Sequence, residues 1–299
     1  MKHLPTTKQL RYFVALARYE HFGKAAEACF VSQPAFSVAI KDLESLLNIQ
    51  LVDRTNKSVT VTSLGRDVAE QARAVLRGLE GLVDIARSNQ APLTGQLKLG
   101  VIPTIAPFLL PRLLPALRKA HPELKLHLKE DLTERVYDRL MDGELDLILI
   151  ALPYELRNVT ELPLFKDRFF LAHQQKSSFV DAQKYHADSL PSDSILLLED
   201  GHCLRDHALS ACDIKNADKV SSITATSLLT LVQMVDADLG ITYLPEMAIN
   251  SNLLKNTRIK TEPMDGASFR EIGLVWRKAS TRVEEFTMLG EFIKSHYQP

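Results

Sequence analysis

Hydrophobic residues follow one spacing in the first third of the chain and another in the remainder. Up to about residue 95 they recur every three or four positions, which is the period of amphipathic helices, except where valines alternate with threonines in one short segment. Beyond that point short apolar segments of strand length alternate with helical segments. The pattern therefore predicts a mostly helical N-terminal part and a larger α/β part.

The first 62 residues carry the pattern of a winged helix-turn-helix. Thr6 or Thr7 is expected to cap a first helix. The second helix runs over 22–29 and places Cys29 on its inward, non-reactive face. Ser32 is a good cap for a third helix, because Pro34 is tolerated in a first turn.

The third helix separates apolar from polar positions. Gln33, Ser37 and Lys41 share its outward face at spacings of four. Such a small polar face suits the major groove of DNA, where Gln33 can pair with base edges and Lys41 with phosphate. A plain three-helix bundle with a solvated face explains the same pattern. The inward positions are all apolar: Phe36, Ile40, Leu43 and Leu47.

Two further elements follow this predicted bundle. Residues 51–62 read as a β-hairpin, since Val59 and Val61 alternate with threonines and Asn56-Lys57 forms the tip. A long helix is then expected from Thr62 or Ser63 to about residue 89. The apolar residues of this helix recur at spacings that alternate between three and four in its later part. Either a dimer interface or packing against its own domain explains this row. The row is Leu64, Val68, Ala72, Val75, Leu79, Leu82 and Ala86.

The α/β part is predicted from a regular alternation of segments. The segment 145–151 is almost wholly apolar, which suits the middle of a parallel sheet. The other strands are expected at 96–102, 124–129, 165–172, 194–198, 221–225, 240–244 and 271–277, and helices at 107–120, 134–141, 226–235 and 281–294.

The segment 198–212, LEDGHCLRDHALSAC, holds two of the three cysteines. Its apolar spacing predicts a helix with Asp200 as the N-cap and Cys203 in the first turn, where the helix dipole, His202 and Arg205 favour a thiolate. A helix through both cysteines separates them by roughly 13 Å. A disulfide requires Cα atoms within about 7 Å. A bond between Cys203 and Cys212 therefore requires the helix to unwind.

Two plainer interpretations of these cysteines stay open at this point. A cysteine in a cytosolic protein is most often a small buried hydrophobe. The set His202, Cys203, His207 and Cys212 could also bind zinc, although its spacing departs from the usual paired ligands.

Composition narrows the class of protein. Residues 1–65 carry eight basic and five acidic residues, a net charge of +3, whereas the rest carries 28 and 32, a net charge of −4. A basic N-terminal unit fits contact with nucleic acid. Three cysteines are too few for a disulfide scaffold. We expect no signal peptide and no membrane span, because the longest apolar run is 147–152. These features favour a cytoplasmic protein.

Two stretches resemble a known family. LEDGHCLRD at 198–206, with a second cysteine nine residues after the first, and FVALARYEHFGKAAEACFVSQPAFSVAIKDLESLLNIQLVDR at 13–54 are similar to the peroxide-sensing OxyR branch of the LysR-type transcription regulators. The resemblance extends over nearly the whole chain. It implies a winged helix-turn-helix DNA-binding domain at 1–62, a dimerising linker helix at 63–90 and a redox-sensing regulatory domain at 95–299.

The resemblance also implies the architecture of the regulatory domain. That domain is expected to be a two-lobed α/β domain like those of periplasmic binding proteins. Lobe I would comprise 95–166 and 268–299, and lobe II would comprise 167–267. The chain would then cross between the lobes twice, and a ligand pocket would lie between them at strand ends.

Functional residues are carried over from the resemblance one by one. Cys203 would be the peroxidatic cysteine and Cys212 the resolving cysteine. The peroxide-binding residues would be Thr104, Thr133, His202 and Arg270, which without the resemblance would pass for helix caps, a loop residue and a surface base. The DNA-binding residues would be Ser32, Gln33, Pro34, Ser37, Lys41 and Arg54.

The implied function is a transcription regulator of oxidative-stress genes that is switched by hydrogen peroxide. Cys203 would become a sulfenic acid and then a disulfide with Cys212, and a cytosolic thiol reductant would reset it. The partners would be double-stranded promoter DNA, further copies of the chain in a dimer or tetramer, and RNA polymerase. No cofactor, metal or enzymatic role is implied. The alternatives are a LysR-type regulator that binds a small metabolite between the lobes, and a thiol peroxidase.

Overall fold

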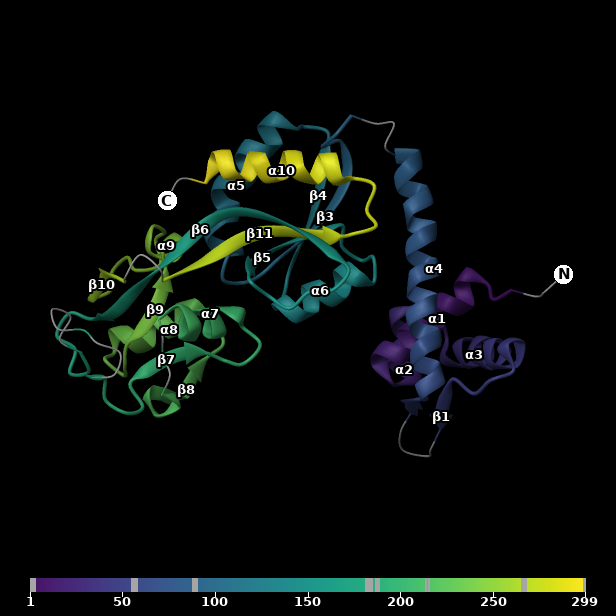
Figure 1. Ribbon diagram of the computed structural model, residues 1–299, viewed down its shortest axis with the longest axis horizontal. Helices are drawn as coiled ribbons and strands as arrows, with labels where there is room; N and C mark the ends of the chain where they lie inside the picture. Colours follow the sequence, from purple (N-terminus) through teal and green to yellow (C-terminus); the bar gives the residue numbers. More distant parts are fainter. Residues whose placement is uncertain are drawn as a thin grey trace. The chain divides into compact units, whose positions relative to one another are not determined.

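The computed structural model describes residues 4–54, 59–87, 91–180, 185, 189–212, 214, 216–264 and 268–297. The chain divides into two compact units, Met1–Arg87 and Ser88–Pro299, and each is described by itself (Figure 1). No helix in these ranges is both long and apolar enough to cross a membrane.

The N-terminal unit has the helices and hairpin that the sequence predicts. Helices α1 (Thr7–Tyr19), α2 (Phe22–Ala28) and α3 (Gln33–Leu47) precede the antiparallel strands β1 (Val52–Arg54) and β2 (Val59–Val61). Thr6 caps α1 in a capping box with Gln9, and Ser32 is the N-cap residue of α3. The predicted hairpin tip at 56–57 lies outside the described residues.

The core of this unit is formed by the apolar faces of its three short helices. Phe13, Phe36 and Ile40 are fully buried, and the rings of Tyr12 and Phe36 stack with their centroids 5.0 Å apart. The prediction of a core position for Cys29 was only partly right. Cys29 is the C-cap residue of α2 and is half-buried, because the helix ends one residue before it.

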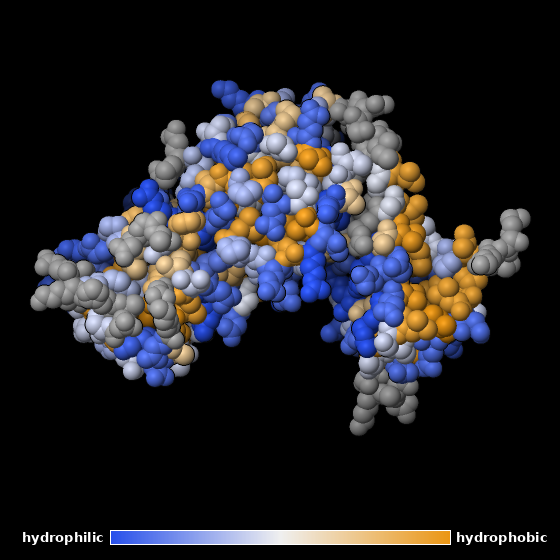
Figure 2. Space-filling view, viewed as in Figure 1, coloured by the Kyte–Doolittle hydropathy of each residue, from blue (hydrophilic) through white to orange (hydrophobic). Residues whose placement is uncertain are grey.

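Helix α4 (Ser63–Arg87) begins where the sequence predicts. Ala69 and Ala72 are buried within the N-terminal unit. The later part of the apolar row is exposed: Val75 at 51%, Leu79 at 39% and Leu82 at 62%. Figure 2 shows hydrophobic surface along this part of the molecule. From Val75 to Leu82 the helix therefore carries an apolar stripe that is exposed in this chain.

A seven-stranded sheet organises the second unit. Its strand order is β10-β6-β11-β5-β3-β4, and β9 also pairs with β6. Figure 1 shows α5 (Ala106–Ala120) and α10 (Val283–His296) on one face of the sheet and α6 (Thr133–Met141) on the other. The strands are β3 (Gly95–Val101), β4 (Leu124–Glu130), β5 (Leu147–Leu152), β6 (Val159–Gln174), β9 (Thr242–Pro245), β10 (Ile259–Pro263) and β11 (Phe269–Arg277).

The buried strand β5 departs from the prediction of a wholly parallel environment. It pairs in parallel with β3 on one side but antiparallel with β11 on the other. The reason is that β11, from the C-terminal part of the chain, lies between β5 and β6 and runs antiparallel to both. All six residues of β5 are buried, in agreement with its apolar sequence.

Two long strands extend through both halves of the unit. Strand β6 is 16 residues long, twice the predicted segment 165–172, and β11 runs antiparallel beside it. The remaining elements are β7 (Ile195–Leu198), parallel to β8 (Val220–Ala225), with α7 (Cys203–Ala211), α8 (Leu228–Asp236), α9 (Glu246–Ile249) and the 3-10 turn η3 (Ala217–Lys219).

Buried apolar side chains form two separate cores in this unit. The first core surrounds β3, β5 and β11 and includes Leu149, Ile150 and Leu274. The second core surrounds β7 and α8 and includes Leu196, Val232 and Leu244. Because β6 contributes Leu164 to the first core and Phe169 to the second, residues in the middle of this strand lie between the two cores.

Candidate functional site

A buried ion pair lies where the chain passes between the two cores. Arg270 at the start of β11 is the register partner of Asp167 in β6, and Arg270 Nε donates to Asp167 Oδ2 at 2.9 Å. Both side chains are 0% exposed. Burial raises the pKa of Asp167, and the Arg270 guanidinium partly offsets that rise. The Met247 amide donates to the other oxygen, Oδ1, at 3.0 Å.

The remaining donors of Arg270 fix a threonine beside it. Nη1 donates to Thr104 Oγ1 and Nη2 to the Thr104 carbonyl, each at 2.9 Å, and Nη2 also contacts Met247 Sδ at 3.6 Å. A guanidinium has five N–H groups. Its four contacts within the described residues leave one Nη1–H for another acceptor. Since Thr104 Oγ1 accepts from Arg270, its own proton remains available to donate.

Cys203 lies against this cluster as the first residue of α7. It is buried in the first core rather than in the second core, where most of α7 packs. The thiol is close enough to Thr133, Arg270 and the Ala151 backbone for each to lower its pKa, whereas Asp206 raises it. Burial is the largest effect and raises the pKa of Cys203, so the resting side chain is a neutral thiol at neutral pH.

The start of α7 differs from the sequence prediction. Asp200 is not the N-cap residue: it is exposed and pairs with Arg205 at 3.1 Å, and His202 occupies the N-cap position. Gly201 just before it has a φ of 94°, a left-handed conformation that glycine adopts without strain. The helix therefore begins two residues later than expected. Although Cys203 is at its N-terminus, burial outweighs the helix dipole that we expected to favour a thiolate.

Two of the predicted peroxide-binding residues, Thr133 and His202, lie in different surroundings from each other. Thr133, the first residue of α6, is buried beside Cys203; its hydroxyl faces the thiol and makes no other hydrogen bond among the described residues. His202 is half-buried, and its interactions are with the Thr226 backbone and Glu199. The structure thus brings Thr104, Thr133 and Arg270 together with Cys203, whereas the role of His202 stays a prediction.

Cys212 lies at the opposite end of α7. It is the C-cap residue, and its thiol is buried in the second core, which raises its pKa to about 12. Tyr185 and Tyr243, whose hydroxyls are 2.7 Å apart, lie close to it. Both cysteines are free thiols. The nine-residue helical separation corresponds to roughly 13 Å, which excludes a disulfide in this conformation.

The two thiols therefore do not converge with His202 and His207 on a common point. No group of three or more His, Cys, Asp or Glu residues in the described ranges is arranged to hold a metal ion. The C-terminal end of α7 is fixed by a hydrogen bond from outside the helix: Ser268 Oγ donates to the Ala211 carbonyl at 2.8 Å.

The predicted DNA-binding residues are gathered on α3 and the hairpin. Gln33, Pro34 and Lys41 are exposed on α3, opposite its buried apolar face, and Ser37 is half-buried. Ser32 is exposed at the N-cap position. Arg54 ends β1, and its side chain lies outside the described part of the chain.

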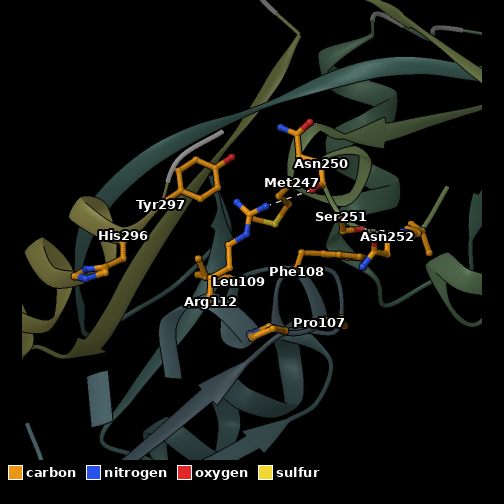
Figure 3. Close-up of a pocket in the computed structure, with 12 residues that line it drawn as sticks. Pro107, Phe108, Leu109, Arg112, Met247, Asn250, Ser251, Asn252, His296 and Tyr297 are labelled. Carbon is orange, nitrogen blue, oxygen red and sulfur yellow. Dashed lines mark hydrogen bonds between the residues drawn. The ribbon is translucent and has the colours of Figure 1, made fainter. Parts of the chain in front are cut away.

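A second concave site lies between α5, the turn after α9 and the end of α10 (Figure 3). This pocket has a volume of about 450 Å³. Arg112 Nη2 donates to the Asn250 carbonyl at 3.4 Å across it, and the Tyr297 ring stacks on Phe165 at 3.6 Å. Met247 lines the pocket and also contacts Arg270, so the pocket adjoins the ion-pair cluster.

Sequence reasoning missed Asp167 and Met247, which hold Arg270 in place. Asp167 lies inside an extended strand, where a single aspartate carries no local signal. The one available clue was physical: a buried arginine requires a carboxylate partner, and a carboxylate inside a strand is a candidate.

Comparisons with known proteins assign both units to the same family. Residues 7–66 match the model of the bacterial regulatory helix-turn-helix protein, lysR family, and residues 90–298 match the LysR substrate binding domain. The chain is 39% identical over 295 residues to the transcriptional regulator EstR of Acinetobacter baylyi, covering 98% of each. It is 37% identical over 293 residues to the transcriptional dual regulator OxyR of Escherichia coli K12, covering 96% of this chain and 94% of that one.

A solved structure shows that the fold is also shared with this family. The full-length OxyR of Pseudomonas aeruginosa, solved with one cysteine replaced by aspartate, aligns with a TM-score of 0.75 and 34% identity. The alignment covers 99% of this chain and 100% of that one. The two-part fold inferred from the sequence is therefore confirmed.

Replacing Asp167 by asparagine tests the ion pair. We expect Asp167→Asn to lower the free energy of unfolding by about 3–5 kcal/mol, because it leaves the Arg270 charge buried without a counter-charge. Arg168→Gln, one residue away, removes only the exposed pair with Glu246 and should cost at most about 1 kcal/mol. Denaturant unfolding measures both. Equal stability of the two variants would contradict the role assigned to the ion pair.

Proposed function

Because the chain belongs to the LysR family of bacterial transcription regulators, we propose that it regulates transcription in response to hydrogen peroxide. The signal would be a reversible disulfide between Cys203 and Cys212. The observation that carries this proposal is the position of Cys203, which lies beside Thr133 and the Arg270–Thr104 pair at one end of a helix whose other end holds a second thiol.

The cluster fits the hydrogen-bonding capacity of peroxide. Hydrogen peroxide both donates and accepts hydrogen bonds, so it requires partners of both kinds. Within the described residues, the hydroxyl proton of Thr104 and one Nη1–H of Arg270 have no acceptor. Thr133 supplies a hydroxyl without another partner. His202, the residue before Cys203, completes the proposed set.

The first chemical step oxidises Cys203. Its sulfur attacks one peroxide oxygen, an S–O bond forms, the O–O bond breaks, and the thiol proton ends on the departing hydroxide to give water. Arg270 stabilises the negative charge that develops on the departing oxygen. The product is a sulfenic acid, which is larger and more polar than the thiol and sits in an apolar core.

The second step connects the two ends of α7. The Cys212 thiol attacks the sulfenic sulfur, an S–S bond forms and water leaves. Since the separation must fall from roughly 13 Å to about 7 Å or less, α7 has to unwind. Unwinding removes Cys203 from the first core and Cys212 from the second. A cytoplasmic dithiol reductant would restore both thiols.

The output would be a change in DNA binding. Lys41 and Gln33 on α3 are exposed for contact with double-stranded promoter DNA. The exposed stripe on α4 would pair with a second copy of the chain and so present two recognition helices. A tetramer, RNA polymerase as a contact and a cytoplasmic location complete the proposal. Turnover as a thiol peroxidase is not part of it.

One observation favours a second candidate function. The pocket of about 450 Å³ beside Met247 has room for a small organic molecule, and Arg112 gives it a cationic side chain. The transcriptional regulator EstR is about as similar to the chain as OxyR is, so overall identity alone does not specify the signal. In this alternative a small metabolite between the lobes replaces peroxide as the signal, and both cysteines are only structural.

Peroxide treatment of the whole protein distinguishes the two functions. One equivalent of hydrogen peroxide should produce a Cys203–Cys212 disulfide, detected by peptide mass mapping after blocking free thiols. Cys203→Ser should abolish the product and leave promoter binding of the reduced form unchanged. Cys29→Ser is the matched control, because that cysteine lies in the other unit. Free thiols throughout would favour the metabolite, whereas consumption of many equivalents would indicate a peroxidase.

The recognition helix is tested by removing one charge. Lys41→Ala should weaken promoter binding and lower the slope of log affinity against log salt by about one, as expected for one lost phosphate contact. Lys125→Ala removes the same charge from the exposed edge strand β4. Fluorescence anisotropy at several salt concentrations measures both variants. If the two variants bind alike, α3 has been wrongly assigned.

The α4 stripe is tested by placing a charge in it. Leu79→Glu should weaken self-association at least about tenfold, because an unpaired carboxylate at a helix seam has to be desolvated. Gln71→Glu adds the same charge at an exposed polar position of α4 and should not change it. Sedimentation velocity over a concentration series gives both constants. An unchanged Leu79→Glu dimer would place the interface elsewhere.

A further inference from the structure

His207 lies one helical turn after Cys203 on α7. Residues four positions apart share one side of a helix. Both side chains face the same short segment at the end of β5: the Cys203 thiol interacts with the Ala151 backbone, and His207 Nε2 is 2.9 Å from the Pro153 carbonyl oxygen. The imidazole is thus adjacent to the proposed peroxide site, although neither the sequence motif nor the mechanism above uses it.

The hydrogen bond to Pro153 determines which nitrogen carries the proton. A carbonyl oxygen can only accept, so the neutral ring holds its proton on Nε2 and leaves a lone pair on Nδ1. Nδ1 is buried and has no hydrogen-bond partner among the described residues. A buried acceptor without a partner is costly, and its persistence points to a proton or ligand that reaches it during function.

Without His207, the imidazole beside the thiol is that of His202, which is already engaged with the Thr226 backbone and Glu199. Burial holds Cys203 as a neutral thiol, whereas the nucleophile is the thiolate. Arg270 cannot accept a proton, and the Asp167 carboxylate is fully engaged with Arg270 and Met247. Thr133 is too weakly basic. Among the groups around the thiol, an imidazole with a free lone pair is the one suited to take its proton.

We propose that His207 Nδ1 accepts the thiol proton of Cys203 as peroxide is attacked. This proposal rests on the proposed function. The S–H bond breaks toward Nδ1 while the S–O bond forms and the O–O bond breaks. The imidazolium then returns that proton to the departing hydroxide, which leaves as water. Thiol and peroxide become sulfenic acid and water, and His207 ends as it began. In the resting protein neither Cys203 nor His207 is charged, so no charge of either side chain is buried before peroxide binds.

The expected pH dependence follows from the surroundings of the imidazole. His207 is faced by Arg270 from β11, by Asp206 from its own helix, and by the Pro153 carbonyl after β5. Burial lowers the pKa of His207 below its ordinary value of 6.5. Protonated imidazole cannot accept a proton. The oxidation rate should therefore be constant at neutral pH and fall as pH decreases below about 6.5.

The test measures sulfenic acid formation at Cys203 in a full-length Cys212→Ser protein. Dimedone trapping followed by mass spectrometry gives the second-order rate constant with hydrogen peroxide between about pH 5 and 8. His207→Gln retains an N–H group that can donate to the Pro153 carbonyl but has no basic nitrogen. We expect it to react about a hundredfold more slowly and to lose the acidic decline in rate. His127→Gln on β4 should match the parent.

The outcomes separate this proposal from the one on which it depends. A parent protein that never forms the sulfenic acid would overturn both. A reactive parent with an unchanged rate and pH profile in His207→Gln would overturn only the role of His207. A slower variant whose rate still falls at low pH would also overturn the role of His207. The loss of a purely structural hydrogen bond to Pro153 would lower the rate without changing its dependence on pH. His207→Ala also removes the hydrogen bond to the Pro153 carbonyl, so its rate relative to His207→Gln measures the contribution of that hydrogen bond.

Discussion

The buried Arg270–Asp167 pair is the constraint on which the regulatory unit depends. A guanidinium cannot lose its proton, so a fully buried arginine requires a carboxylate and further acceptors. The pair forms only when β6 and β11 hold their antiparallel register through the junction of the two cores. Its remaining donors then fix Thr104 and contact Met247. Because buried pairs often contribute little net stability, the placement of donors beside Cys203 explains its presence better than stability does.

Burial decides the resting chemistry of the site. Helix position and the Arg270 charge favour a thiolate at Cys203, yet desolvation is the larger effect and raises its pKa. The same holds for Cys212 in the second core. Both thiols are thereby protected from indiscriminate oxidation, since the protonated form is a poor nucleophile. Reactivity then depends on a reactant that the surrounding hydroxyls and guanidinium can bind, which gives selectivity for a small molecule that both donates and accepts hydrogen bonds.

The elements that the sequence predicts best are those fixed by local chemistry. Caps at Thr6 and Ser32 are predicted because a residue with a side-chain hydroxyl precedes a periodic apolar face. The full length of β6 was not, because its first half alternates weakly and is fixed by pairing with β11. The short α9 and the edge strand β10 carry little pattern. For the site, a family resemblance supplied Thr104, Thr133 and Arg270, whereas Asp167 and Met247 depend on tertiary contacts that no spacing encodes.

The short helix α7 connects these effects. Its nine residues are fewer than an isolated helix needs for stability in water, so tertiary contacts must hold it. Cys203 anchors one end in the first core, and Ser268 holds the carbonyl of Ala211 at the other. Converting the Cys203 thiol into a polar sulfenic acid weakens the first anchor, and a helix of this length cannot compensate from within. In the proposed switch, one oxygen atom added to one side chain would therefore loosen a segment that bridges both cores.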